Sequence, residues 1–128
     1  MNKVNRDRIP GLLKKYQAIL RLEDWDITLS DEKPDEKNQA EIDPWPGKNN
    51  AWLRIAEETH DNLDHIVTHE LLHLYECRRN DFLETVLREH ITDAAALNII
   101  TQELRQYQEI SVDKLAGVIE SLMRRKSL

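Results

Sequence analysis

The chain has 128 residues, of which 40% are hydrophobic and 33% are charged, and a net charge of −6, which suits a single solvated domain over residues 1–128. The acidic balance argues against nucleic acid, and no apolar run reaches the roughly 18 residues of a membrane span, so we expect neither nucleic acid nor a membrane as a partner. Cys77 is the only cysteine, which excludes an internal disulfide, and the polar opening residues carry no secretory signal, so the sequence predicts a cytoplasmic location.

The first half of the chain predicts one helix followed by three strands. Apolar residues recur at helical spacing over residues 9–22, and Pro10 suits the first turn of that helix. Apolar and polar residues then alternate over residues 25–30, as in a half-buried strand. Two more extended segments, 39–43 and 51–56, are separated by a turn rich in Pro, Gly and Asn. We expect these two segments to form a hairpin that completes a three-stranded sheet.

The second half of the chain has a helical pattern from Leu63 onward. A helix over residues 62–79 is expected to stop at Asn80, and a longer helix is expected over residues 82–107. Ser111 would then cap a last helix. The predicted order is an N-terminal helix, a small three-stranded sheet with a hairpin, and three further helices, which defines an α+β domain.

One motif carries most of the functional information, the sequence His69-Glu70-Leu71-Leu72-His73 in the first of these three helices. Histidines four residues apart lie on the same face of a helix and can share one ion at Zn–N distances of about 2.0–2.1 Å. Zinc lowers the pKa of a coordinated water to about 7, which makes hydroxide available at neutral pH. Glu70 would accept the proton of that water as a general base and pass it to the leaving group. The motif therefore predicts a zinc-dependent hydrolase with Zn²⁺ as its cofactor.

A catalytic zinc also needs a third protein ligand, which leaves one coordination position for water. The candidates lie on the next predicted helix, where Glu89, His90 and Asp93 all have side chains that can bind zinc. His65 precedes His69 by one more turn, but three successive turns of a straight helix cannot easily surround one tetrahedral ion. We therefore expect His65 to be a polar residue near the helix start rather than a ligand.

The motif followed by Glu89 and Asp93 on a later helix resembles the gluzincin group of zinc metallopeptidases. In particular, it is similar to the minimal zincin-like proteins of phage and bacterial genomes. The resemblance implies that Glu89 is the third zinc ligand and that Asp93 hydrogen-bonds His69, which would fix the direction of the imidazole ring. His90 and Asp93 stay open as alternative ligands.

The resemblance extends to the segment before the motif. It implies that Asn50, Ala51 and Trp52 belong to an edge strand that pairs with an extended peptide substrate. The alternative is that this segment is an inner strand of the sheet. The transition-state donor of the family has no matching motif, and Tyr75, Tyr107 and His60 are the candidates considered.

The leading interpretation is a peptidase that hydrolyses a peptide or protein substrate. The first alternative is a catalytically weak or inactive zincin-like module, which binds zinc and serves a regulatory role with a partner protein. The second alternative is a metal-free helical interaction protein in which the motif occurs by chance. Zinc content separates the second alternative from the other two readings.

Overall fold

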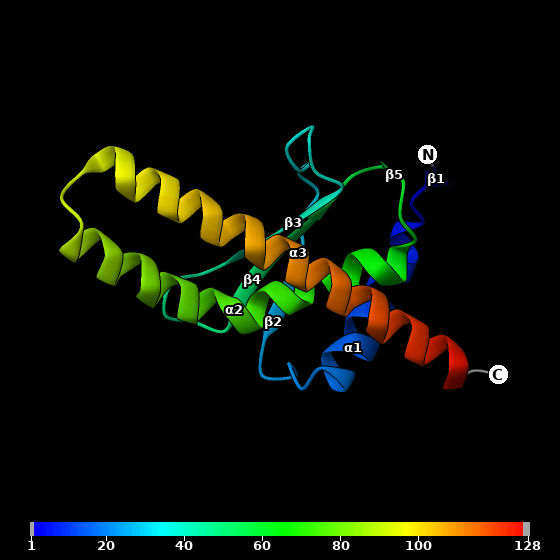
Figure 1. The fold of residues 1–128 in the computed structure, drawn as a ribbon. Coiled ribbons are helices and arrows are strands. Elements are labelled where there is room, and N and C mark those ends of the chain that lie inside the picture. Colours follow the sequence, from blue (N-terminus) through cyan, green and yellow to red (C-terminus); the bar gives the residue numbers. More distant parts are fainter. Residues whose placement is uncertain (1, 127–128) are drawn as a thin grey trace.

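The computed structural model describes residues 2–126 and shows three helices and a small mixed sheet (Figure 1). This confirms the α+β class that the sequence predicts. The elements in chain order are β1 (Asn2–Lys3), the short 3-10 helix η1 (Arg6–Arg8), α1 (Ile9–Ile19), β2 (Asp26–Leu29), β3 (Ala40–Pro44), β4 (Asn50–Ile55), β5 (Glu58–Thr59), α2 (Leu63–His90) and α3 (Ala94–Lys126). β1 and β5 form a separate antiparallel pair.

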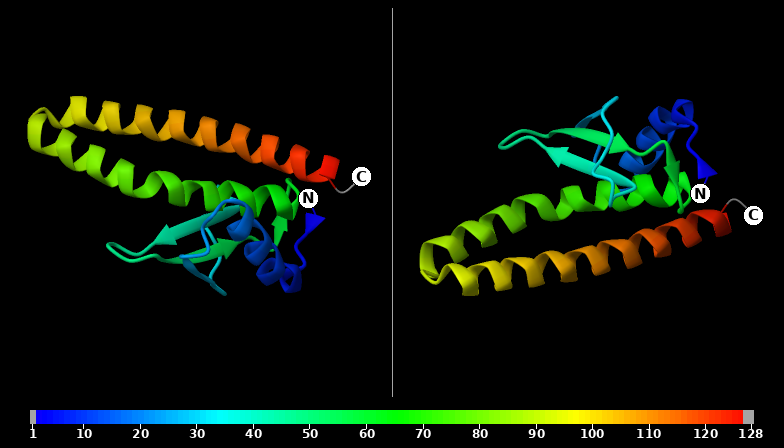
Figure 2. Two further views of the ribbon diagram at one scale, coloured as in Figure 1. Left: turned by 90° about the horizontal axis from the view of Figure 1, so that it is seen from below. Right: turned by 90° about the horizontal axis from the view of Figure 1, so that it is seen from above.

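These elements form three layers, with α2 in the middle (Figure 2). α3 runs along one side of α2, whereas the sheet and α1 cover the other side. Fully buried core residues come from α1, β4 and α2, and they include Ile9, Leu53, Val67 and Leu71. The central position of α2 lets its side chains meet the sheet on one face and α3 on another. None of the helices in residues 2–126 combines the length and the hydropathy that a membrane span requires.

Helix α1 begins where the sequence predicts and ends earlier than predicted. Pro10 stands in its first turn, and its buried face is formed by Ile9, Leu12, Leu13 and Tyr16. The helix ends at Ile19 because Arg21 adopts a left-handed φ of 57°, which turns the chain toward β2. The Tyr16 hydroxyl donates to the Asp64 carboxylate at 2.6 Å, which ties α1 to the first turn of α2.

The three predicted strands are present, and the order of the sheet is β2-β4-β3. β4 pairs in parallel with β2 and antiparallel with β3, across the predicted hairpin. Gly47 supplies a positive φ of 71° in the hairpin turn, a conformation that glycine adopts without steric cost. Ala51, Leu53 and Ile55 are buried on alternate positions of β4, as the period of a strand requires.

The prediction that Asn50, Ala51 and Trp52 belong to an edge strand is wrong. All three residues pair with β2, and Ala51 and Trp52 pair with β3 on the opposite side. The backbone of β4 is therefore engaged along both of its edges and cannot accept a further strand. The alternation of side chains predicts which face of a strand is buried, but it does not predict which strands are neighbours. The edge strand that contacts α2 is β3.

The C-terminal half forms two long helices where the sequence predicts three shorter ones. α2 continues through Asn80, and Ser111 lies inside α3. The chain turns instead at residues 91–93, where the Asp93 carboxylate accepts from the backbone N–H of Ala95 at 3.0 Å. The predicted breaks are wrong because an asparagine or serine inside a helix costs at most about 0.7 kcal/mol, which the packing of two long helices can outweigh.

Candidate metal centre

The HELLH motif lies in the first half of α2, where the helix runs between the sheet and α3. Asn62 caps this helix, since its side-chain oxygen accepts from the backbone N–H of His65 at 2.8 Å. His65, His69 and His73 follow at successive turns, and the ring centroids of consecutive pairs are 6.2 and 5.0 Å apart. All three rings contact carboxylates of α3, so the histidine face of α2 is directed at that helix.

Glu109 of α3 joins the two motif histidines. One of its carboxylate oxygens lies 2.7 Å from Nε2 of His69, and the other lies 3.2 Å from Nε2 of His73. The two Nε2 atoms are themselves 3.2 Å apart. Ligands about 2.0–2.1 Å from a tetrahedral ion are separated by roughly 3.3 Å, so these three donors could surround one ion with only small movements.

Glu70 is buried beside these donors, with 8% of its surface exposed. The ligand atoms of His69, Glu70 and His73 lie within 4.8 Å of one another, so distance alone would also admit Glu70 as a ligand. Glu109 makes direct contacts to both imidazoles, which leaves Glu70 as the neighbouring carboxylate. Burial raises the pKa of Glu70, and the two imidazoles act in the opposite direction. A carboxylate in this place can exchange a proton with a molecule in the adjacent cleft.

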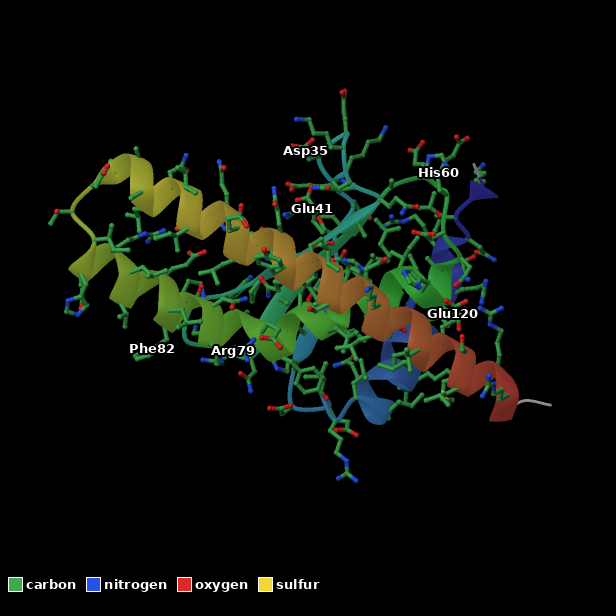
Figure 3. All side chains as sticks on the ribbon, in the orientation of Figure 1. Asp35, Glu41, His60, Arg79, Phe82 and Glu120 are labelled. Atoms are coloured by element: carbon green, nitrogen blue, oxygen red, sulfur yellow. The ribbon has the colours of Figure 1, made fainter. Side chains whose placement is uncertain are left out.

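Asp113, one turn beyond Glu109, contacts His69 on the other side of its ring. The Asp113 carboxylate lies 3.3 Å from Nδ1 of His69 and 3.0 Å from Nε2 of His65. By accepting from Nδ1–H, Asp113 would select the tautomer of His69 whose Nε2 lone pair is free to bind an ion. Glu120 lies 3.2 Å from Nδ1 of His65, near the start of α2 (Figure 3). His65 is therefore held between two carboxylates of α3, although with His69 and Asp113 it forms a second group that could hold an ion.

The electrostatics of the cluster favour a cation. Hydrogen bonds with His69 and His73 hold the pKa of Glu109 well below its usual range. A hydrogen bond with His65 lowers the pKa of Asp113. Burial acts to lower the pKa of His69, but the hydrogen bond to Glu109 and the nearby carboxylates outweigh it and the pKa is raised. Ionised oxygens therefore face imidazole nitrogens across the gap between α2 and α3.

The structure does not bring Glu89, His90 or Asp93 to this cluster. Glu89 and His90 lie in the last turn of α2, and Glu89 is sixteen residues beyond His73 in the same helix, or about 24 Å along its axis. Asp93 lies in the turn between the helices and caps the start of α3. Glu89 therefore cannot share an ion with His73 in this fold, and Asp93 cannot hydrogen-bond His69.

Glu109 and Asp113 take the places that the sequence interpretation gave to Glu89 and Asp93. The sequence contains a signal for this pair, because Glu109 and Asp113 have the same spacing of four residues. Sequence reasoning missed them because it placed a helix break before residue 111, which put Glu109 in a loop. Once α3 is continuous, both side chains fall on the face of α3 that meets the histidines.

A cleft of about 500 Å³ opens beside Glu70, His73 and Glu109. Its opposite wall is formed by β3 and the residue Asn38 before it. A smaller hollow of about 240 Å³ adjoins it and reaches His69. A ligand in the larger cleft would therefore contact both the candidate metal centre and the edge strand of the sheet.

The candidate transition-state donors lie outside this cleft. Tyr75 and Tyr107 line a separate apolar groove between α2 and α3. His60 lies before α2, where its backbone N–H donates to the side chain of Gln39 at 2.6 Å, and its side chain is exposed (Figure 3). Among the described residues that line the cleft there is no tyrosine, and His73 is its one histidine.

Comparison of the chain with protein-family models, with curated proteins and with solved structures finds no match in any of the three. His69, His73 and Glu109 supply two nitrogen donors and one carboxylate, a set that zinc binds in catalytic sites. Their mutual distances would allow them to share such an ion.

Proposed function

We propose that the chain is a zinc-dependent hydrolase that cleaves peptide bonds, with the metal held by His69, His73 and Glu109. The observation that carries this proposal is the approach of these three donors to within 2.7–3.2 Å of one another beside the buried Glu70. Zinc in such a site supplies a Lewis acid and an activated water. His69, His73 and Glu109 would hold the ion as three protein ligands, the number that catalytic rather than structural zinc sites have.

The neighbouring side chains have distinct tasks in this proposal. Glu70 accepts a proton from the attacking water and delivers it to the amine that leaves when the peptide C–N bond breaks. Asp113 holds the ring of His69 from its Nδ1 side, so that the opposite nitrogen keeps its direction. The arrangement resembles that of gluzincins, with Glu109 as the third ligand and Asp113 as the partner of the first motif histidine.

β3 offers a binding site for an extended peptide. Backbone hydrogen bonds at both ends of the hairpin pair residue 56 with residue 39 and residue 45 with residue 50. Because hydrogen-bonded and non-hydrogen-bonded pairs alternate in an antiparallel ladder, the backbone groups of Ala40 and Ile42 point away from β4. Both residues line the cleft. A substrate strand pairing with them would lie beside Glu70 and the metal ligands.

A zinc-binding interaction module is the second candidate, and one observation favours it. No tyrosine lines the cleft in the described part of the chain, so Tyr75 and Tyr107, the tyrosines considered as oxyanion donors, are absent from it. In that case the same three ligands bind zinc, the metal stabilises the pairing of α2 and α3, and the cleft recognises a peptide without cleaving it.

Hydrolysis and zinc content distinguish these readings. We expect the purified chain to cleave peptides once it is reconstituted with zinc. Mass spectrometry would detect the fragments that it produces from a broad peptide library. Dialysis against a chelator should stop cleavage and lower the melting temperature, because the metal binds only the folded state. Restored zinc should recover both properties.

Two other outcomes would contradict the proposed hydrolase. Stoichiometric zinc without any cleavage would contradict the hydrolase and support the interaction module. A chain that takes up no zinc, and whose melting temperature ignores the chelator, would contradict both functions.

A further inference from the structure

A stripe of exposed residues runs along α3 on a side that no other described element covers. The six apolar members are between 37% and 66% exposed. At the helical repeat of 100° per residue, the stripe occupies a sector of about 80°. Its members are Ile100, Leu104, Tyr107, Ser111, Leu115, Val118 and Leu122. A narrow apolar stripe of this kind is typical of a helix that packs against another helix.

The spacing of the stripe is symmetric about Ser111. Successive members are separated by four, three and four residues on either side of this serine. If two copies of α3 lie antiparallel with a two-fold axis at Ser111, each apolar residue faces an apolar residue. Leu104 then meets Val118 of the partner copy, and Tyr107 meets Leu115. A two-fold interface requires such self-complementarity, because the same surface patch of each chain contacts the equivalent patch of the other chain.

α2 extends this surface. An apolar groove of about 420 Å³ lies beside the stripe, and Tyr75 and Leu83 contribute to it from α2. These two residues are 49% and 38% exposed. With these two residues the surface contains eight exposed apolar side chains. If each side chain buries on the order of 100 Å², the surface covers the area of about 800 Å² per partner that is standard for a stable interface. The groove can receive the stripe of a second copy.

The charges along the helical hairpin are also complementary in the antiparallel arrangement. Residues 81–105, at the tip of the hairpin, contain five acidic residues and two basic residues, one of which, Arg105, forms an ion pair with Glu84. Residues 114–126 contain four basic residues and one acidic residue. Antiparallel pairing places the basic end of one copy beside the acidic tip of the other, which favours this orientation over the parallel one.

We propose that the chain forms a two-fold homodimer in which α3 of one copy packs antiparallel on α3 of the other, centred at Ser111. Glu109 lies about 160° around the axis of α3 from the middle of the stripe. The dimer therefore leaves the cleft open on both copies. This inference is independent of the proposed hydrolysis.

Sedimentation velocity of the full chain over a range of concentrations tests the proposal. The wild type should sediment as a species of twice 15.1 kDa. Leu115→Glu places a charge in the stripe and should weaken dimerisation by at least about 100-fold. Ile99→Glu is the matched control, because Ile99 is 61% exposed on the same helix and lies outside the stripe. Circular dichroism verifies that both variants keep their helices.

A cross-link tests the position of the axis without relying on a disruptive variant. In a Cys77→Ala background, Ser111→Cys should form a disulfide-linked dimer under mild oxidation, because the two introduced thiols face each other at the axis. Ile99→Cys in the same background should stay uncoupled. A monomeric wild type, a dimer that Leu115→Glu leaves intact, or a dimer without the Ser111→Cys cross-link would overturn the proposal.

Discussion

Replacing Glu109 with alanine should lower the zinc affinity of the chain by at least about 100-fold, since losing even an outer-sphere partner of a zinc ligand costs 10- to 100-fold. Glu109 contacts both motif imidazoles through its two carboxylate oxygens. Its removal leaves the two motif histidines without the α3 carboxylate that contacts both of them. Competition with a fluorescent zinc chelator would measure the affinity of wild type and variant under the same conditions.

Glu89→Ala is the matched control for this experiment. Glu89 is also an exposed glutamate followed four residues later by an aspartate, but it lies at the far end of α2. Its replacement should leave the zinc affinity unchanged. If Glu89→Ala released the metal and Glu109→Ala retained it, the ligand set proposed here would be wrong and the sequence-based assignment would stand.

Glu70→Gln should retain zinc and lower kcat for peptide cleavage by about 100- to 10,000-fold, the range that one general acid–base group contributes. The amide has nearly the shape of the carboxylate but cannot accept the proton of the attacking water. Because Glu70 is only 8% exposed, the conservative replacement also avoids a cavity in the core. Initial rates on the best substrate from the peptide library, together with zinc content, provide the measurement.

Glu76→Gln is a suitable comparison on the same helix. Glu76 forms an ion pair with Arg79 and lines the apolar groove rather than the cleft. It should keep both zinc and the wild-type rate. Equal rates for Glu70→Gln and wild type would show that another group moves the proton, and the role given to Glu70 would have to be abandoned.

Local sequence patterns predicted much of this fold. The N-terminal helix, the three strands, the hairpin and the helical position of His69 and His73 follow from periodicity and turn residues over short stretches of chain. These features depend on neighbours within a few residues, so the sequence carries them directly.

The turn between the C-terminal helices could not be placed in this way. Asn80 and Ser111 are weak helix breakers, and whether a helix continues through them depends on what packs against it. Here Arg105 of α3 contacts Glu84 of α2, and such contacts between the two helices support their length. The ligand assignment depended on the position of this turn, so one misplaced boundary moved the prediction from Glu109 to Glu89.

Local sequence patterns also could not identify which strand lies at the edge of the sheet. The alternation in β4 shows a buried face at Ala51 and Leu53, which is the same for an edge and for a central strand. The position of β4 in the sheet depends on its parallel pairing with β2, which brings together residues far apart in the sequence. The substrate strand was therefore assigned to β4, whereas the edge strand that borders the cleft is β3.

Diffraction at the zinc absorption edge from crystals of the zinc-reconstituted chain tests the central claim most directly. We expect one anomalous peak per chain within about 2.0–2.2 Å of Nε2 of His69, Nε2 of His73 and a carboxylate oxygen of Glu109. No peak at this place, or a peak bound by Glu89 or His90 instead, would contradict the metal centre and the hydrolase proposed from it.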